Sequence, residues 1–531
     1  MSLSPDLLPV LTPLPVLIPM LAAATTLVFG RRPRTQRMVA LIALSAAVVV
    51  CATLLFLADR DGTTAIQVGA WETPIGITLV VDRLAATMEL VSSIVLLAVA
   101  VYGAGQNIRD ADSQQPTSIF WPTYLVLSAG VSMTFLAGDL FNLFVGFEIL
   151  LVASFVLLTL GATEERIRAG VSYVMVSMLS SLIFLTGIAL AYGATGTLNM
   201  AQLALRMDEV PDGIRNAVYA VLLVAFGIKA AVFPLSSWLP DSYPTAPAPV
   251  TAVFAGLLTK VGVYSIIRTY TLIFPDGGFD NVLLIAGLLT MLVGILGAIA
   301  QSDIRRLLSF TLVSHIGYMV FGVGLASRMG LSGAVYYIAH HILVQTALFL
   351  VVGLIERQAG SASLRRLGGL AAASPLLAIL FLVPALNLGG IPPFSGFVGK
   401  VALLQAGAQN GSVLAWTLVA GSVVTSLLTL YVVARVWSKA FWRPRAEASE
   451  GHLATATLPT LVEDSTDMLY DERADPGRMP ALMVTSTAAL VGVGLALTVW
   501  AGPILNIADR AADDLRDRGV YITAVLRSEP R

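Results

Sequence analysis

The stretch VLLVAFGIKAAVFPLSSWLP (residues 221–240) combines two features that are costly in a membrane helix. It is mostly apolar, yet it carries Lys229, and Pro234 follows five positions later. A cation near the bilayer centre costs on the order of 3 kcal/mol or more. An interior proline removes a helix hydrogen bond and clashes with the carbonyl four residues back. The stretch therefore predicts a membrane span that is interrupted and that carries a functional charge.

The composition gives the class of protein. Of the 531 residues, 56% are apolar and 12% are charged, whereas a soluble domain has about 25% charged residues. The chain is therefore an integral membrane protein. Its first residues lack a basic segment, which favours an uncleaved first span. The single cysteine, Cys51, excludes an internal disulfide and a cysteine metal cluster. Motifs for phosphate, zinc or nucleophilic catalysis are missing from the sequence, so we expect no cofactor and no enzyme activity.

Apolar segments of roughly 20 residues, the length that crosses a ~30 Å hydrocarbon core, recur along the whole chain. They predict an all-α polytopic protein with fourteen spans, and an even number puts both termini on one side. The predicted spans are 6–29, 38–57, 84–105, 118–136, 140–161, 168–191, 215–237, 247–270, 282–300, 304–325, 332–355, 375–402, 413–436 and 480–503.

The basic residues orient these spans. Eighteen arginines and lysines fall in one set of loops, including the segment after the thirteenth span, and only six fall between spans on the other side. Positively charged loops are cytoplasmic, so both termini are expected outside the cytoplasm of a prokaryotic cell. The six residues on the outer side are Arg60, Arg83, Arg206, Arg215, Arg268 and Arg328.

Lysine is used differently from arginine in this chain. Three of its four lysines, Lys229, Lys260 and Lys400, fall inside predicted spans. A buried lysine can lose its proton, whereas an arginine effectively never does. The three lysines are therefore candidate proton carriers.

An acidic residue and three histidines join them. Glu148 lies nine residues beyond Asp139, where the fifth span begins, which is about 13 Å deep at 1.5 Å per residue. A carboxylate at that depth needs a nearby cation. His315 falls in the tenth span, and His340 and His341 fall in the eleventh. Histidine exchanges protons near neutral pH, so the seven residues together predict a proton relay.

Each residue also has a structural interpretation. A buried lysine can simply pair with a structural acid, and a histidine can be a hydrogen-bonded core residue. Asp82 and Glu89, near the start of the third span, are interpreted as facing the outer interface and are left out of the relay. Trp121 and Trp238 are interpreted as interfacial anchors.

A second interruption is predicted in NLGGIPPFSGFVGK (387–400), where Pro392 and Pro393 precede Lys400 by about two helical turns. Helix breaks are tolerated in a bilayer where they are buried in protein or line a wet cavity. In transporters, breaks at corresponding places in two halves indicate the ion path. The short similarity between VFPLSSW and IPPFSGF suggests that the seventh and twelfth spans correspond.

Four stretches resemble one family. DLFNLFVGFEILLVASFVLL, FGIKAAVFPLSSWLPDSYPTAPAPVTAVFAGLLTKVGVYSIIR, SHIGYMV and GIPPFSGFVGK are similar to the antiporter-like subunits shared by complex I and Mrp-type multisubunit cation/proton antiporters, and most similar to the D subunit of the latter. The resemblance implies fourteen helices, two inverted five-helix repeats and interrupted helices 7 and 12. It also implies that Glu148 and Lys229 form the family's Glu–Lys pair, with Lys260 as its central lysine and Lys400 as its terminal one.

The resemblance divides the chain into parts. Residues 1–117 are expected to form helices 1–3, 118–270 the first repeat, 271–436 the second repeat, 437–479 an acidic flexible loop, and 480–531 helix 14 with a C-terminal tail. The polar segment 446–478 is foreign to the family pattern. Gln345 stands where relatives often have lysine, which leaves His340 or His341 to supply a charge there.

The expected function is proton conduction coupled to cation export in a multisubunit Na+/H+ antiporter of the cell membrane, with other membrane subunits, the lipid bilayer, Na+ and H+ as partners and no nucleic acid. Two alternatives come from other classes: a membrane-arm subunit of complex I or of a membrane-bound hydrogenase, and an assembly scaffold whose buried charges only lock helices together. Neighbouring genes would separate the antiporter from the redox-driven complexes. Genes for antiporter partner subunits favour the antiporter, and genes for iron–sulfur subunits favour complex I or a hydrogenase.

Overall fold

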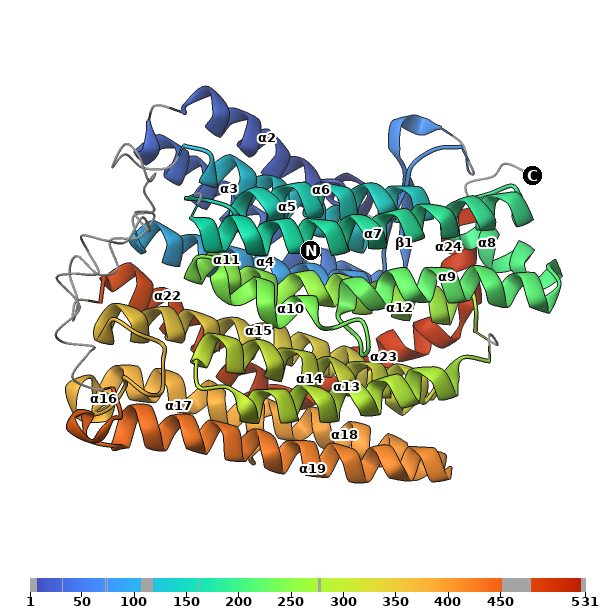
Figure 1. Cartoon of the computed structure of the whole chain (residues 1–531). Helices are drawn as coiled ribbons and strands as arrows, with labels where there is room; N and C mark the ends of the chain where they lie inside the picture. Colours follow the sequence, from blue (N-terminus) through green and yellow to red (C-terminus); the bar gives the residue numbers. More distant parts are fainter. Residues whose placement is uncertain are drawn as a thin grey trace.

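The described residues form a bundle of long, roughly parallel helices with one small β-hairpin (Figure 1). The structure is a computed structural model, and it describes residues 7–30, 32–71, 73, 75–106, 118–161, 163–275, 278–450 and 479–526. The helices are α1 (Leu7–Leu11), α2 (Leu14–Val28), α3 (Pro33–Asp61), α4 (Arg83–Gln106), α5 (Phe120–Leu136), α6 (Leu140–Leu158), α7 (Glu164–Thr195), α8 (Met200–Arg206), α9 (Asp212–Ala230), α10 (Trp238–Ser242), α11 (Ala248–Val253), α12 (Thr259–Leu272), α13 (Asp280–Ala300), α14 (Ile304–Gly324), α15 (Arg328–Ala359), α16 (Leu370–Ala373), α17 (Pro375–Gly389), α18 (Ser395–Asn410), α19 (Val413–Val436), α22 (Ala481–Val499), α23 (Ala501–Arg516) and α24 (Arg518–Leu526).

Shorter elements connect these helices. The 3-10 turns are η1 (Val68–Ala70), η2 (Met207–Glu209), η3 (Tyr243–Thr245) and η6 (Arg445–Glu447), and the π-helical turns are η4 (Phe254–Leu258) and η5 (Trp437–Trp442). Strands β1 (Thr64–Gln67) and β2 (Thr78–Val81) pair antiparallel, with Thr64 opposite Val81. We call the end of the bundle that carries these strands the hairpin end.

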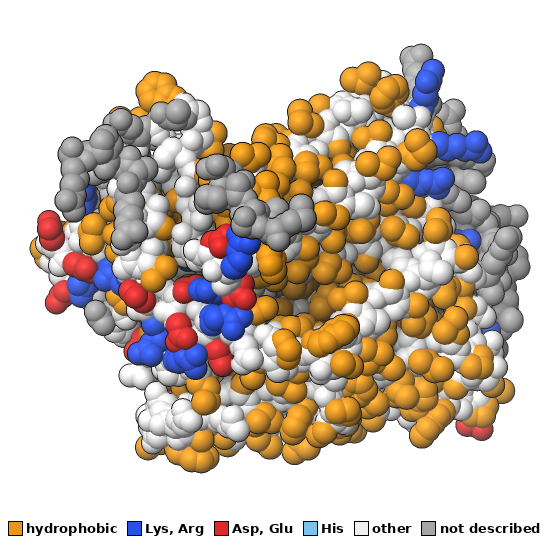
Figure 2. All heavy atoms as spheres, turned by 180° about the vertical axis from the view of Figure 1, so that it is seen from behind, with side chains coloured by type: hydrophobic (Ala, Val, Ile, Leu, Met, Phe, Trp, Pro, Cys, Tyr) orange, Lys and Arg blue, Asp and Glu red, His pale blue; other side chains and the backbone are white. Residues whose placement is uncertain are grey.

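Twelve helices in the described residues are long and apolar enough to cross a membrane. Two shorter apolar helices, α5 and α17, lie between them in the chain, so the predicted total of fourteen spans requires that both also cross. Apolar side chains cover much of the surface, while charged side chains gather towards its two ends (Figure 2). This distribution is that of a protein whose middle faces lipid.

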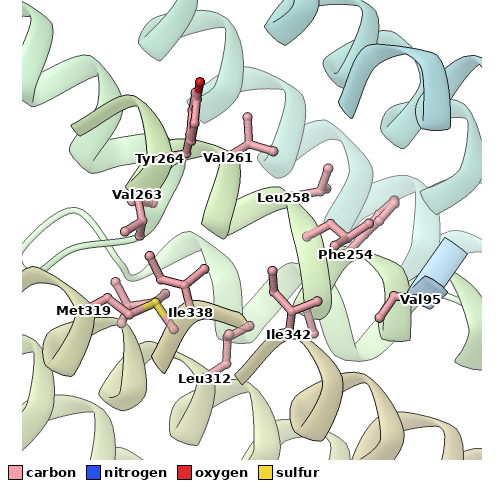
Figure 3. Packing of buried hydrophobic residues seen from close by; sticks show 14 of the residues in the cluster. Val95, Phe254, Leu258, Val261, Val263, Tyr264, Leu312, Met319, Ile338 and Ile342 are labelled. Atoms are coloured by element: carbon pink, nitrogen blue, oxygen red, sulfur yellow. The ribbon is translucent and has the colours of Figure 1, made fainter. Parts of the chain in front are cut away.

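Three helices form the centre of the bundle. The most apolar stretches of α14 and α15, and of the span that combines α11, η4 and α12, are almost completely buried. Phe254, Leu258, Leu312, Ile338 and Ile342 pack between them (Figure 3). The central polar side chains described below therefore lie within protein rather than against lipid.

The chain leaves the helical path at both proline-containing stretches. Helix α9 ends at Ala230, and Ala231 takes a left-handed conformation with φ 56°. Helix α17 ends at Gly389, Gly390 is left-handed with φ 81°, and α18 begins only at Ser395. Each of these helix ends leaves backbone carbonyls without a helical partner.

The segment after α22, expected as a tail, instead forms helices α23 and α24. Helix α23 packs along α15 and is held at the hairpin end by ion pairs. Arg328 binds Asp513 at 2.5 Å, and Arg83 binds Asp514 at 2.7 Å and Asp59 at 2.9 Å. The C-terminal region is therefore part of the folded bundle. Most of the predicted flexible insertion, 446–478, lies outside the described residues.

Several predicted positions were wrong. Asp82 and Glu89 do not face the outer interface, because they are 3% and 1% exposed. Arg268 lies within α12, where it is buried against Asp82 rather than placed in a loop. The hydropathy pattern gave no sign of the Asp82–Arg268 pair, since it depends on a contact between distant spans.

The two tryptophans have contacts that the sequence did not predict. Trp121 is buried in the core. Trp238 is half-buried, and its indole N–H donates to the carbonyl of Ile228 at 3.1 Å. Trp121 is therefore not an interfacial anchor. Trp238 instead satisfies one of the carbonyls at the end of α9.

Candidate functional site

Glu148 and Lys229 lie on different helices, α6 and α9, and a third helix joins them. The Ser181 hydroxyl, on α7, donates a short hydrogen bond to Glu148 Oε1. Lys229 Nζ lies 3.4 Å from the same hydroxyl oxygen. Within the described part of the chain no carboxylate lies within 4.0 Å of Lys229 Nζ. The expected pair is therefore bridged by Ser181 rather than made by direct contact.

The Lys229 ammonium has further partners. It donates to the backbone carbonyl of Ser177 at 3.4 Å and lies 5.6 Å from the ring centre of Phe147. Lys229 also occupies the last turn of α9, where the helix dipole favours a cation. The site thus holds a positive charge with several weak contacts instead of one strong ion pair.

Lys260 is completely buried and has a different environment. Its Nζ donates to the carbonyl of Ala255 at 2.6 Å. Ala255 belongs to the π-helical turn η4, directly before α12. Such single π-turns inside helices are frequent at functional sites. The lysine is therefore held by backbone rather than by an acid.

The end of α9 reaches the helix that carries Lys260. A side chain at Gly262 would lie 2.9 Å from the carbonyl carbon of Lys229 and 2.6 Å from the backbone nitrogen of Ala230. Only glycine permits this close approach of the two backbones. The position of Lys229 is therefore coupled mechanically to α12, two residues from Lys260.

The three histidines form one cluster between α14, α15 and α18. His315 Nδ1 and the Tyr337 hydroxyl are 2.7 Å apart, and the rings of His315 and His341 are centred 5.2 Å apart. His340 Nδ1 lies 3.0 Å from Ser395 Oγ. His341 is also within electrostatic range of Lys260. The structure therefore brings all three histidines together in the most buried part of the bundle.

Four ring nitrogens of this histidine cluster have no protein partner among the described residues. These are Nε2 of His315, Nε2 of His340 and both ring nitrogens of His341. Buried polar atoms are normally hydrogen-bonded, and exceptions are often catalytic or satisfied by water. The cluster can therefore accept or donate protons without first breaking a protein hydrogen bond.

Lys400, on α18, is the last of the seven candidate residues. Its Nζ donates to the carbonyls of Leu388 at 3.0 Å and Gly389 at 3.1 Å, the free carbonyls at the end of α17. It also lies 5.1 Å from the ring centre of Tyr318, which packs against His315. Both Lys229 and Lys400 therefore lie beside a helix end.

Gln345 does not join the cluster by any described contact. It is buried, and its side-chain NH2 group donates to the carbonyl of Leu308 at 2.8 Å. In the described residues, no group of three metal-ligating side chains could hold a metal ion.

Sequence reasoning missed the hydroxyl groups that connect these residues: Ser181, Tyr337, Tyr318 and Ser395. Hydroxyl groups within apolar spans were the available signal. The serine run SMLSSLIF (177–184) did not show which serine faces the site.

A family model, related sequences and a solved structure all place this chain in the same family. The model described as "NADH:quinone oxidoreductase/Mrp antiporter, TM" matches residues 137–429. The Na(+)/H(+) antiporter D subunit of Alkalihalophilus pseudofirmus is 38% identical over 518 residues, covering 97% of this chain and 99% of the relative. The corresponding D subunit of Bacillus subtilis is 34% identical with the same coverage. A chain in the structure of the Mrp complex from Dietzia sp. DQ12-45-1b is 33% identical, with a TM-score of 0.86 over 97% of this chain and 99% of that chain.

These relatives cover essentially the whole length of the chain, not only its central motifs, and they are named as subunits of a secondary transporter rather than as enzymes. The chain is accordingly an antiporter subunit of the membrane and not an enzyme. It belongs to the NADH:quinone oxidoreductase/Mrp antiporter family, in the group of Mrp Na+/H+ antiporter D subunits.

Proposed function

We propose that this subunit conducts protons along a relay within the membrane and couples their movement to cation export. The relay consists of Glu148, Lys229, Lys260, His315, His340, His341 and Lys400. The observation that carries the proposal is the arrangement around Lys229: a cation held by weak contacts, bridged to an acid, on a helix end that packs directly against the Lys260 helix.

The relay starts at the bridged pair. While Ser181 joins Glu148 to Lys229, the negative charge favours protonated lysine. When that bridge opens, Lys229 loses this stabilisation and releases its proton towards Lys260. Because α9 and α12 are in close backbone contact at Gly262, a shift of the α9 end also displaces α12.

The second part runs through the histidine cluster. A proton from Lys260 passes to His341 and His315 and then to His340, which is held by Ser395 at the start of α18. Lys400 is the last carrier before the exit. The carbonyls at the end of α17 hold its ammonium form.

The same proposal includes the finer architecture and its setting. Fourteen spans, with 118–270 and 271–436 as inverted repeats, place α9–α10 and α17–α18 as the interrupted seventh and twelfth spans. Both termini lie outside the cytoplasm of a bacterial cell, and the subunit works with other membrane subunits. The Mrp complex structure supports the association with other membrane subunits. The two helix ends beside Lys229 and Lys400 support the two interrupted spans.

Substitution of Lys229 tests the relay. Lys229→Arg keeps the charge but cannot release a proton in the physiological range. We expect the variant to assemble normally in the complex and to lose most antiport, measured as sodium-driven proton flux in vesicles. The double variant Lys229→Ala with Glu148→Ala is expected to stay inactive while still folding. Near-normal exchange by Lys229→Arg would show that the pair is only structural.

A further inference from the structure

Glu89 is a buried acid that the relay does not use. It lies on α4 and is 1% exposed. One carboxylate oxygen, Oε2, accepts from Ser132 on α5 at 2.9 Å and lies 3.8 Å from Cys51 Sγ on α3. The other oxygen, Oε1, has no partner among the described residues. Three helices thus enclose a carboxyl group that forms no ion pair within 4.0 Å in the described part of the chain.

An isolated ionised carboxylate is very costly in such a place, so the neutral, proton-bearing form is favoured. The other charged or titratable groups around Glu89 are Cys51 on α3 and Tyr264 on α12, the latter within electrostatic range. Neither is a cation. Glu89 is therefore placed to hold a proton rather than a charge.

A chain of polar contacts leads from Tyr264 towards the hairpin end. Tyr264 and Arg268 are four residues apart on α12, and Arg268 Nη2 lies 3.2 Å from the Tyr264 hydroxyl oxygen. Arg268 Nη1 pairs with Asp82 Oδ2 at 2.6 Å. Lys260 lies one turn further along the same face of α12, because residues four apart share a helix face. The face therefore runs from the central lysine of the relay to a buried ion pair.

This ion pair lines a cavity at the hairpin end. The cavity is bounded by Asp82 and Arg268 together with Asp514, Arg518 and Tyr521 of the C-terminal helices. Tyr521 is 4% exposed, and its hydroxyl has no partner among the described residues. The Arg268 guanidinium lies 5.1 Å from the Tyr521 ring centre. A polar cavity with an unsatisfied hydroxyl is a suitable place for water.

We propose that Glu89 is a further proton-carrying residue, and that Asp82, Tyr264, Arg268 and Tyr521 connect it to the hairpin end. Protons enter from the cavity, pass the Asp82–Arg268 pair and the Tyr264 hydroxyl, and exchange between Glu89 and the α12 face that carries Lys260. Each transfer moves one proton and no electrons. The inference rests on the proposed relay function and gives it a second opening, separate from the Lys400 exit.

Two variants in the intact complex test this path. Glu89→Gln keeps the shape and the Ser132 contact but cannot carry a proton. Tyr264→Phe removes the hydroxyl next to Arg268. Because proton transfer by a positioned group contributes on the order of 10²-fold or more, we expect each variant to lower sodium-driven proton flux in vesicles by about tenfold or more.

Matched controls use similar groups outside the path. Tyr124 is a buried tyrosine that also donates to a backbone carbonyl, that of Leu96 at 2.7 Å, and Tyr264 donates in the same way to Phe135 at 2.6 Å. Tyr124→Phe and Asp212→Asn, the latter at an exposed carboxylate of α9, should transport like the wild type. Antiport by the wild type together with normal flux in Glu89→Gln would overturn the second path and leave the relay standing.

A second measurement does not depend on transport. Dicyclohexylcarbodiimide reacts with protonated carboxyl groups within membranes, and peptide mass spectrometry maps the modified residue. We expect labelling at Glu89 in the assembled wild-type complex. In the transport assay, Glu89→Asp should restore part of the flux that Glu89→Gln loses. Absence of labelling at Glu89 in a complex whose other membrane-embedded carboxyl groups react would refute the inference even if Glu89→Gln assembled poorly.

Discussion

The Ser181 hydroxyl is the contact whose removal tests the bridged pair most directly. In Ser181→Ala, Glu148 loses the short hydrogen bond that it accepts, and Lys229 loses its 3.4 Å contact. A hydrogen bond to a charged group contributes about 1.5–3 kcal/mol. Since 1.4 kcal/mol is a factor of ten, the population of the joined state should fall by about 10- to 100-fold. Proton flux through the complex should fall with it.

Ser180 provides the matched control, because it is the adjacent residue on the same helix. Its hydroxyl donates to the carbonyl of Ala225, on α9, at 2.9 Å. Ser180→Ala therefore removes a hydroxyl of the same size between the same two helices without touching Glu148 or Lys229. We would compare sodium-driven proton flux across a range of pH in vesicles that contain equal amounts of assembled complex.

Ser181→Thr retains the hydroxyl and should recover most of the flux, whereas Ser181→Ala should also shift the pH at which transport is half-maximal. Equal flux and equal pH profiles for the two alanine variants would refute the idea that Ser181 joins the acid to the lysine.

Three other predictions concern separate parts of the chain. His340→Ala combined with His341→Ala should abolish exchange, whereas Gln345→Lys should be tolerated or move the pH optimum upward; full activity of the double variant would remove these histidines from the path. A cysteine at Ser449, which is exposed, should react with membrane-impermeant reagent only from the cytoplasmic side, and labelling from outside would overturn the topology. The guanidinium of Arg328, at the start of α15, holds the pKa of Asp513 below its ordinary value of 3.8. The contribution of this ion pair to the attachment of α23 is therefore present above the ordinary pKa and is lost as the pH falls through the lowered pKa of the folded protein. Hydrogen exchange in α23 should accelerate at that acid limit, and Asp513→Asn should remove this pH dependence.

The class of protein and most of the candidate residues could be predicted from the sequence, because their signals are local. Twenty-residue apolar segments specify spans, and a lysine or histidine inside one stands out by its cost. The position of Lys400 near a helix end followed from Pro392 and Pro393 in the same way, since prolines and glycines act on the backbone beside them.

The contacts between spans could not be predicted in this way. Glu148 was expected to have a cation nearby, but nothing in the sequence indicated that Ser181 lies between Glu148 and Lys229. Asp82 and Arg268 were assigned to the membrane surface, although they pair in the interior across 186 residues of sequence. Hydropathy gives the depth of a residue but not the direction in which it faces, so buried ion pairs near span ends are mistaken for loop charges.

The attachment of the C-terminal helices also bears on the order in which the molecule is completed during synthesis. Arg83 binds both Asp59, which precedes it closely, and Asp514, which is 431 residues further along. Chains are made from the N-terminus, and early parts fold first. Nearly the whole chain is therefore translated before Arg83 gains its second carboxylate. Closure of the hairpin end is thus a late event in biogenesis, and a chain released before residue 514 would keep that end open.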